Sequence, residues 1–211
     1  MRGLRWAKPA RAPGEQIHER VWPGCDKRDK HSDSDMTPTS TPTAVTVRPA
    51  CAADIGALVS GNAAMAAETE GVTLDRDRLR RGIEAVLDDP RHGFYLVAER
   101  DGRRAGQLMV TYEWSDWRAG RFAWIQSVHV EPGARKRGVF RALYDAVIAW
   151  AGGEDDVVGV RLYVEKANSG ARRTYEAVGM YAADYQMYEL DFVLERPERD
   201  RGHAEPDRPR S

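Results

Sequence analysis

A short basic loop between two regular segments constrains the fold of this chain most strongly. Residues 121–130, RFAWIQSVHV, have the β-branched and aromatic composition of a strand. Apolar side chains in GVFRALYDAVIAWA recur at helical spacing and predict a helix over 137–151. The basic triplet 135–137 and Gly138 separate the two segments. A strand, a short loop and a helix in succession indicate an α/β fold.

The rest of the chain extends this pattern. We expect strands at 44–50, 93–100, 105–114, 121–130, 157–164 and 181–190, and helices at 52–68, 73–89, 137–151 and 169–178. The order β-α-α-β-β-β-α-β-α-β predicts a mixed α/β (α+β) sheet flanked by helices. Its N-terminal part should be antiparallel, with a parallel step around the central helix.

Composition divides the chain into three zones. Residues 1–44 are rich in Pro, Ser, Thr and mixed charge, and predict a disordered N-terminal extension. A start at Met36 is the alternative for this segment. Residues 45–194 carry the regular pattern and predict one domain, and residues 195–211 predict a disordered charged tail.

Charge and cysteine content narrow the function classes. The 32 basic and 33 acidic residues nearly balance, which argues against a nucleic-acid binder. No apolar run approaches the ~18–20 residues of a membrane span. Cys25 and Cys51 are the two cysteines, so a disulfide framework is not expected and a cytoplasmic location is the prediction.

The basic loop has the chemistry of an anion site. The first N–H groups of a helix have no acceptor within it, and the helix dipole adds about half a positive charge there. Gly138 allows an anion to approach the backbone, and the neighbouring arginines add charge-assisted hydrogen bonds. The alternative is a solvated turn that happens to precede a helix.

The sequence VEPGARKRGVFRAL resembles the cofactor loop of the GNAT superfamily of N-acetyltransferases. In that family a strand ending V-x-P is followed by R/Q-x-x-G-x-G/A. Val130, Pro132, Arg135 and Gly138 match this motif. Phe140 stands where the family has Gly or Ala, and this bulky side chain should crowd the pyrophosphate unless it turns into the core.

A second block carries the same resemblance. The sequence YVEKANSGARRTYEAVGM is similar to the family's last helix, N-x-x-A-x-x-x-Y-x-x-x-G-F/M. The matching residues are Asn168, Ala171, Tyr175, Gly179 and Met180. The resemblance extends over roughly residues 45–191.

The resemblance implies an acetyltransferase that uses acetyl-CoA as co-substrate and no metal. A primary amine of a small molecule or a protein would attack the acetyl group directly. The implied cofactor-binding residues are Val128, His129, Val130, Arg135, Lys136, Arg137, Gly138, Val139, Phe140, Arg141, Asn168, Ala171 and Tyr175. Arg137, Gly138 and the first N–H groups of the helix would face the pyrophosphate, whereas Lys136 would lean toward the adenosine or the solvent.

The reaction needs a proton donor for the leaving thiolate and a base for the amine. By resemblance Tyr175 is the acid, and its alternative is a core tyrosine on an amphipathic helix. Candidates for the base are Glu68 and Glu70, between the first two helices, and Glu113 on the third strand. Each is also explained as a solvated or structural carboxylate, and a water relay would serve equally.

Two further residue types on the central strands are open to more than one interpretation. His129 is a candidate proton shuttle by its residue type, but strict alternation would turn it away from Trp124, Gln126 and Val128. Trp114, Trp117 and Trp124 would either line an acceptor pocket or pack the sheet.

Two other functions fit the same resemblance. One is transfer from a different acyl-CoA, and the other is a non-catalytic acyl-CoA-binding module. The acceptor cannot be read from the sequence, and the chain is expected to be either a monomer or a homodimer.

Overall fold

The structure is a computed structural model that describes residues 44–194. The predicted extension and the predicted charged tail lie outside the described residues, apart from residue 44. The chain folds into two compact units, with the division between Asn168 and Ser169.

The first unit is built on a five-stranded sheet in the order β1-β2-β3-β4-β5. The strands are β1 (Thr46–Pro49), β2 (Phe94–Arg100), β3 (Arg103–Ser115), β4 (Gly120–Val130) and β5 (Val157–Leu162). The pairs from β1 to β4 are antiparallel, whereas β4 and β5 are parallel. This topology confirms the predicted mixed α/β class, including its parallel step.

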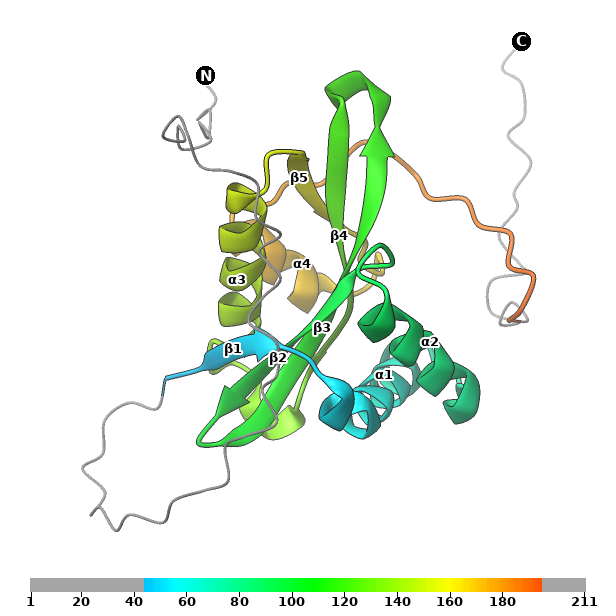
Figure 1. The fold of residues 1–211 in the computed structure, drawn as a ribbon, viewed down its shortest axis with the longest axis vertical. Coiled ribbons are helices and arrows are strands. Elements are labelled where there is room, and N and C mark those ends of the chain that lie inside the picture. Colours follow the sequence, from blue (N-terminus) through cyan, green and yellow to red (C-terminus); the bar gives the residue numbers. More distant parts are fainter. Residues whose placement is uncertain (1–43, 195–211) are drawn as a thin grey trace. The chain divides into compact units, whose positions relative to one another are not determined.

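Helices cover both faces of this sheet. Helices α1 (Ile55–Thr69) and α2 (Arg76–Asp88) lie on one face, and α3 (Val139–Gly153) lies on the other (Figure 1). Asp75 caps α2, because its carboxylate accepts the N–H groups of Asp77 and Arg78 at 2.9 and 3.1 Å.

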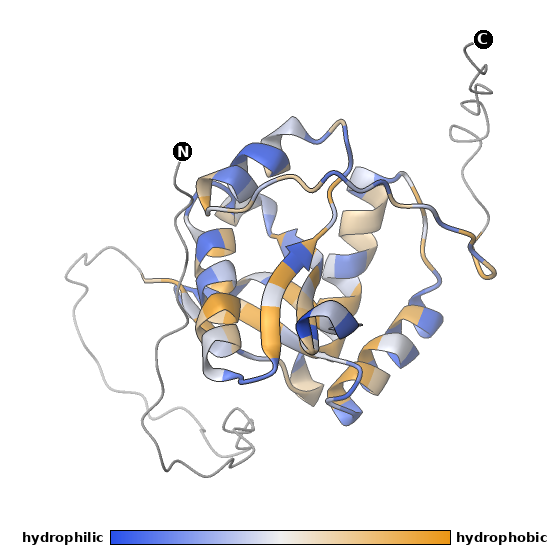
Figure 2. Ribbon diagram, turned by 90° about the horizontal axis from the view of Figure 1, so that it is seen from above, coloured by the Kyte–Doolittle hydropathy of each residue, from blue (hydrophilic) through white to orange (hydrophobic). Residues whose placement is uncertain are grey.

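Hydrophobic residues gather on the strands and on parts of the helices, while polar residues occupy much of the remaining helix surface (Figure 2). The core between the sheet and α1–α2 contains Leu58, Val59, Ile83, Tyr95 and Val97. On the other face α3 buries residues of one helical stripe, namely Val139, Leu143, Tyr144, Val147 and Ala151. The two apolar stripes fix the sheet between its helical layers.

The second unit differs from the sequence-based prediction in one element, the strand expected at 181–190. It contains α4 (Ser169–Ala177), as the sequence predicts, but residues 181–190 form no strand. A strand requires a hydrogen-bonded partner, and the described part of this unit contains no other strand. Its apolar side chains are exposed instead, including Tyr181, Tyr185 and Phe192. A strand-like composition alone therefore does not make a strand.

An ion pair at the start of α1 gives a first testable prediction. Arg48 donates to both carboxylate oxygens of Asp54 at 2.7 and 2.9 Å, and the Cys51 N–H donates at 2.8 Å. Burial acts to raise the pKa of Asp54, but these hydrogen bonds outweigh it and hold the pKa below its usual 3.8. We expect Asp54→Asn to lower the free energy of unfolding by about 2 kcal/mol at pH 7.

The pH dependence of this loss has a defined sign. A carboxyl with a depressed folded-state pKa stabilises the fold above its unfolded pKa, and that contribution is lost as the pH falls. The stability gap between wild type and Asp54→Asn should therefore narrow below about pH 4 in urea titrations. Asp145→Asn, in an exposed pair with Arg141, is the control and should cost less than about 0.5 kcal/mol. An equal loss in both variants would contradict the prediction.

Candidate active site

The predicted anion loop lies between the end of β4 and the start of α3. Lys136 and Gly138 both have positive φ, at 60° and 80°. A glycine tolerates this conformation without strain, and left-handed residues turn backbone N–H groups into a concave loop. The first bond within α3 runs from Ala142 N–H to Gly138 O at 2.9 Å, so the N–H groups of Val139 and Arg141 have no acceptor within the helix. The loop therefore fits a phosphate group.

Arg135 joins this loop to the end of α1. Its two terminal nitrogens donate to the two carboxylate oxygens of Glu68 at 2.7 and 2.6 Å, and its Nε donates to Val130 O at 3.1 Å. Hydrogen bonds from Arg135 lower the pKa of Glu68. Two predicted site residues from distant parts of the chain are thus in direct contact. Glu70 lies two residues further on, at the exposed C-cap of α1.

Strand β4 separates from β5 before it reaches the loop. The β4–β5 ladder ends at the pair of Ile125 and Leu162, although β4 continues to Val130. Glu131 N–H donates to Ala105 O on β3, so strand alternation turns the N–H groups of Val128 and Val130 toward the β5 side. These two N–H groups lie beyond the end of the ladder. They are placed to bind an extended ligand between the strands.

A β-bulge on β4 overturns the predicted orientation of His129. Gln107 pairs with His129, but Met109 pairs with Gln126, so β4 has one extra residue near Ser127, whose φ is 49°. The bulge reverses the alternation, so His129 lies on the same face of the sheet as Trp124 and Gln126. Of the three residues named in the prediction, only Val128 points to the opposite face from His129. His129 is buried, and its Nε2 lies 3.6 Å from Glu131 Oε2.

A buried polar chain crosses the interface between α1 and the sheet. Gln107 Nε2 donates to Asn62 Oδ1 at 2.7 Å, and Asn62 Nδ2 donates to Tyr95 OH at 3.1 Å. Arg104 donates to Gln107 at one end and to Glu131 at 2.6 Å at the other. This polar chain was not predicted from the sequence, although a glutamine within the apolar stretch of β3 was a signal for it.

A second polar cluster lies on the exposed part of the α1–α2 face. Glu113 accepts hydrogen bonds from Trp124 Nε1 and, at 2.9 Å, from Arg161. The Arg161 guanidinium also lies 3.6 Å from the centre of the Phe122 ring. Arg161 was not predicted as a site residue, although an arginine within the apolar run VVGVRLYV of β5 was the available signal.

The three tryptophans do not form one cluster. Trp114 and Trp117 are exposed, at 65% and 85% of their surface, and so do not pack the sheet. Trp124 is partly buried, and its ring centre lies 6.0 Å from that of Tyr163. Only Trp124 therefore joins the polar face around Glu113.

Phe140 lies in the first turn of α3, half-buried, with its ring centre 6.1 Å from that of Tyr144. Neighbouring Val139 is the residue that enters the core. Arg141 pairs with Asp145 one turn further along the helix, at 2.8 Å. Phe140 therefore lies near the Tyr144 ring, Val139 lies in the core, and Arg141 lies along the helix surface beside Asp145.

The second sequence block falls on both sides of the division between the units. Asn168 ends the first unit, and its N–H donates to Glu165 O at 3.0 Å. Ala171 and Tyr175 lie on α4 in the second unit. Burial raises the pKa of the half-buried Tyr175 phenol, so its protonated, proton-donating form predominates at neutral pH.

The fold and the comparisons with known proteins together define a class of enzyme, the acyltransferases. Residues 63–180 match the model of the Acetyltransferase (GNAT) family, which is more than half of the chain. The chain belongs to this family and is an acyltransferase.

Solved structures support this assignment. The chain is 42% identical to a possible acetyltransferase from Clostridium difficile 630, over 71% of this chain and 99% of that chain, with a TM-score of 0.65. It shares the fold of a predicted acetyltransferase with acetyl-CoA from Clostridium acetobutylicum (21% identity, 70% and 96% covered, TM-score 0.58). It also shares the fold of ribosomal-protein-alanine N-acetyltransferase from Brucella melitensis biovar Abortus 2308 (22%, 71% and 100%, TM-score 0.56). No curated protein matches the chain.

Residues 44–194 contain neither a membrane-spanning helix nor a cluster of metal ligands. Neither α1 to α4 nor any other described helix is long and apolar enough to cross a membrane. Within the same residues, no three His, Cys, Asp or Glu side chains converge as a metal site.

Proposed function

We propose that this enzyme transfers the acetyl group of acetyl-CoA to a primary amine of a small molecule or protein by direct attack. The observation that carries the proposal is the continuous segment from β4 through the loop to α3. In this segment the N–H groups of Val128 and Val130 lie beyond the end of the β4–β5 ladder, and Gly138, with positive φ, follows at the start of the helix. We further propose a cytoplasmic enzyme that is a monomer or homodimer.

The proposed roles follow the backbone of this unit. The N–H groups at the start of α3, with Arg137, bind the pyrophosphate, because a helix N-terminus favours negative charge. The N–H of Val128 polarises the thioester carbonyl as its oxygen gains charge. Asn168 and Ala171 complete the proposed cofactor-binding set with His129, Arg135, Lys136, Phe140 and Tyr175.

The proposed chemistry needs two proton transfers. The neutral amine nitrogen forms a bond to the acetyl carbon, and the C–S bond breaks. Tyr175 donates its proton to the departing thiolate, and the raised pKa of its phenol supports this role. The proton of the amine leaves to a carboxylate or to water.

Glu68, Glu70 and Glu113 remain the proposed carboxylates for that last proton. The bidentate contact with Arg135 favours a positioning role for Glu68, because the same contact lowers its pKa and weakens it as a base. Glu113 lies beside Trp124 on the α1–α2 face, where an indole ring and a carboxylate would suit a cationic amine. A water relay fits these contacts as well.

Calorimetry with acetyl-CoA, followed by a thiol-release assay over a panel of amines, tests the proposal. We expect acetyl-CoA to bind alone and thiol release to require one class of amine. The panel should include polyamines, aminoglycosides, amino acids and protein N-termini. Binding without release on any amine would favour the non-catalytic module, and no binding would contradict both functions. Tighter binding of a longer acyl-CoA would favour a different acyl donor.

Substitution of Glu68 and Glu70 separates positioning from proton transfer. We expect Glu68→Gln to raise the KM for acetyl-CoA by about threefold to tenfold, because it removes one charge from the contact with Arg135. If Glu68 were the base, the substitution would instead lower kcat by about a hundredfold and shift the acidic limb of the pH profile of kcat. Glu70→Gln is the matched variant two residues away. Unchanged kcat/KM for every amine in both variants would remove both glutamates from the site.

A further inference from the structure

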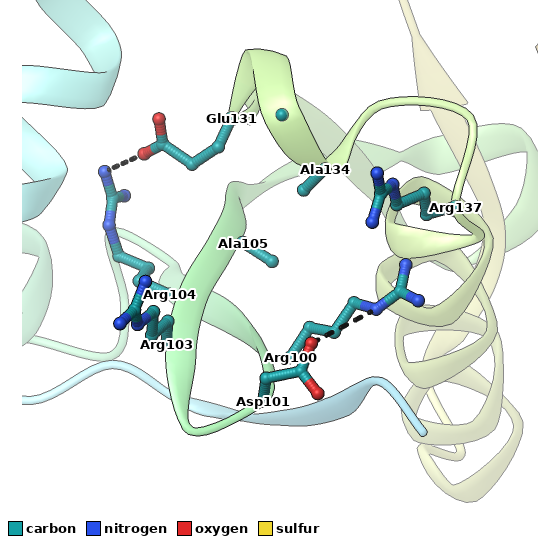
Figure 3. Close-up of a pocket in the computed structure, with 9 residues that line it drawn as sticks. Arg100, Asp101, Arg103, Arg104, Ala105, Glu131, Ala134 and Arg137 are labelled. Atoms are coloured by element: carbon teal, nitrogen blue, oxygen red, sulfur yellow. Dashed lines mark hydrogen bonds and ion pairs between the residues drawn. The ribbon is translucent and has the colours of Figure 1, made fainter. Parts of the chain in front are cut away.

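A pocket of about 380 Å³ lies beside the cofactor loop, on the side of the β2–β3 hairpin. Figure 3 shows Arg100 and Arg137 on one side of it and Arg103 and Arg104 on the other, with Ala105 between them. The hairpin supplies three of the arginines, and the segment between β4 and α3 supplies Arg137. Two parts of the chain that are far apart in sequence therefore bring four guanidinium groups around one hollow.

The geometry of the hairpin explains how the arginines come together. Asp101 and Gly102 both have positive φ, as a two-residue type I′ turn requires. Arg100 is paired directly with Arg103 across this turn. Like charges opposite each other in a sheet are destabilising, so the fold itself gives no reason for this pair.

The charges in the pocket are not balanced. Asp101 and Glu131 are its two carboxylates, so four arginines leave two positive charges in excess. Glu131 is committed to Arg104 at 2.6 Å, and Asp101 lies 3.7 Å from Arg100 Nε. That Nε is buried and has no hydrogen-bond partner. Among residues 44–194, no carboxylate lies within 4.0 Å of the guanidinium of Arg103 or Arg137.

The shape of the pocket leaves room for an anion between these charges. Its remaining lining is small, with Ala105, Gly133 and Ala134, and a Cβ on Gly133 would meet no atom within 4 Å. A guanidinium offers a planar fork of donors that matches the oxygens of a phosphate. The volume accepts a phosphate and part of the molecule that carries it.

We propose that this arginine pocket is a second anion site that binds the phosphate of a phosphomonoester. It is separate from the N–H groups at the start of α3, and Arg137 is the only proposed cofactor-binding residue that lines it. The phosphate could come from a separate phosphorylated compound or from the 3′-phosphate of CoA, and only the second source rests on the proposed function. Either source offsets the two excess positive charges of the pocket.

Inorganic phosphate, titrated into the full chain by calorimetry, is the first arm of the test. We expect Arg103→Ala to weaken phosphate binding about tenfold, because it removes a charge-assisted contact without touching the cofactor loop. Arg81→Ala is the control, since it removes an exposed arginine from α2 outside the pocket. Both variants should unfold at the wild-type temperature within a few degrees.

The second arm compares CoA with dephospho-CoA, which lacks the 3′-phosphate. A wild-type preference for CoA that disappears in Arg103→Ala identifies CoA as the source of the phosphate. A preference that is the same in both proteins, together with weaker binding of inorganic phosphate to the variant, identifies a separate compound. The proposal is overturned if Arg103→Ala retains both the wild-type phosphate affinity and the wild-type CoA preference, or if the wild type shows neither. Failure to bind acetyl-CoA would contradict the proposed function and leave the phosphate arm as an independent test.

Discussion

Gly138→Glu should abolish acetyl-CoA binding while the protein stays folded. A carboxylate at the start of α3 would face the phosphates that we place there, and two like charges about 4 Å apart near a surface repel by about 4 kcal/mol. We therefore expect the Kd to rise at least ~100-fold in calorimetry. The fold should survive, because a Cβ at position 138 meets no atom within 4 Å. The positive φ of 80° adds a strain of only about 1 kcal/mol.

Two further variants separate charge from backbone strain. Gly138→Ala adds the strain without the charge and should raise the Kd by less than about tenfold. Gly152→Glu adds the same charge near the other end of α3, again in open space, and should leave acetyl-CoA binding unchanged. If Gly138→Glu bound acetyl-CoA like the wild type, the loop would be a surface turn and the phosphates would bind elsewhere.

Tyr175→Phe should lower kcat by about 10²- to 10⁴-fold and leave the Kd for acetyl-CoA within about twofold, the range expected for the loss of a general acid. Burial raises the pKa of the Tyr175 phenol above its usual value of 10.0. The phenol therefore stays protonated in the wild type, and no alkaline loss of kcat from this group should occur below pH 10. Stopped-flow or steady-state thiol release, with the best amine of the panel, measures the effect.

Tyr112→Phe is the matched control for this experiment. Tyr112 lies on β3, and burial also raises the pKa of its phenol. Removing this hydroxyl should change kcat by less than about threefold. An equally small effect in Tyr175→Phe would assign Tyr175 to packing on α4 instead of catalysis.

Much of the fold could be read from the sequence because local patterns specify it. The apolar stripe of α3 at positions 139, 143 and 147 is buried as its spacing predicts. The Asp101–Gly102 turn carries the residue types that its backbone demands. The prediction of an anion loop has the same basis, since Gly138 and its basic neighbours are contiguous in the chain.

Pairing between distant segments was not predictable in this way. The expected strand at 181–190 has aromatic and apolar residues typical of strands, but a strand exists only where a partner strand offers hydrogen bonds. The orientation of His129 depends on a bulge near Ser127, and one extra residue in a ladder reverses every side chain after it. Neither feature can be recognised in the amino-acid sequence of β4 or of the C-terminal segment.

The sequence by itself determined the order of the helices and of the first five strands, and the family, because each rests on residues a few positions apart. The prediction of the anion loop rests on contiguous residues as well. Only the tertiary structure decided that Arg135 contacts Glu68 and that Arg103 and Arg137 meet in one pocket. These side chains are separated by 67 and 34 positions in the chain, and long-range packing of α1, the β2–β3 hairpin and α3 brings them together. The excess charge of that pocket is a property of the folded chain, because the whole sequence is nearly neutral.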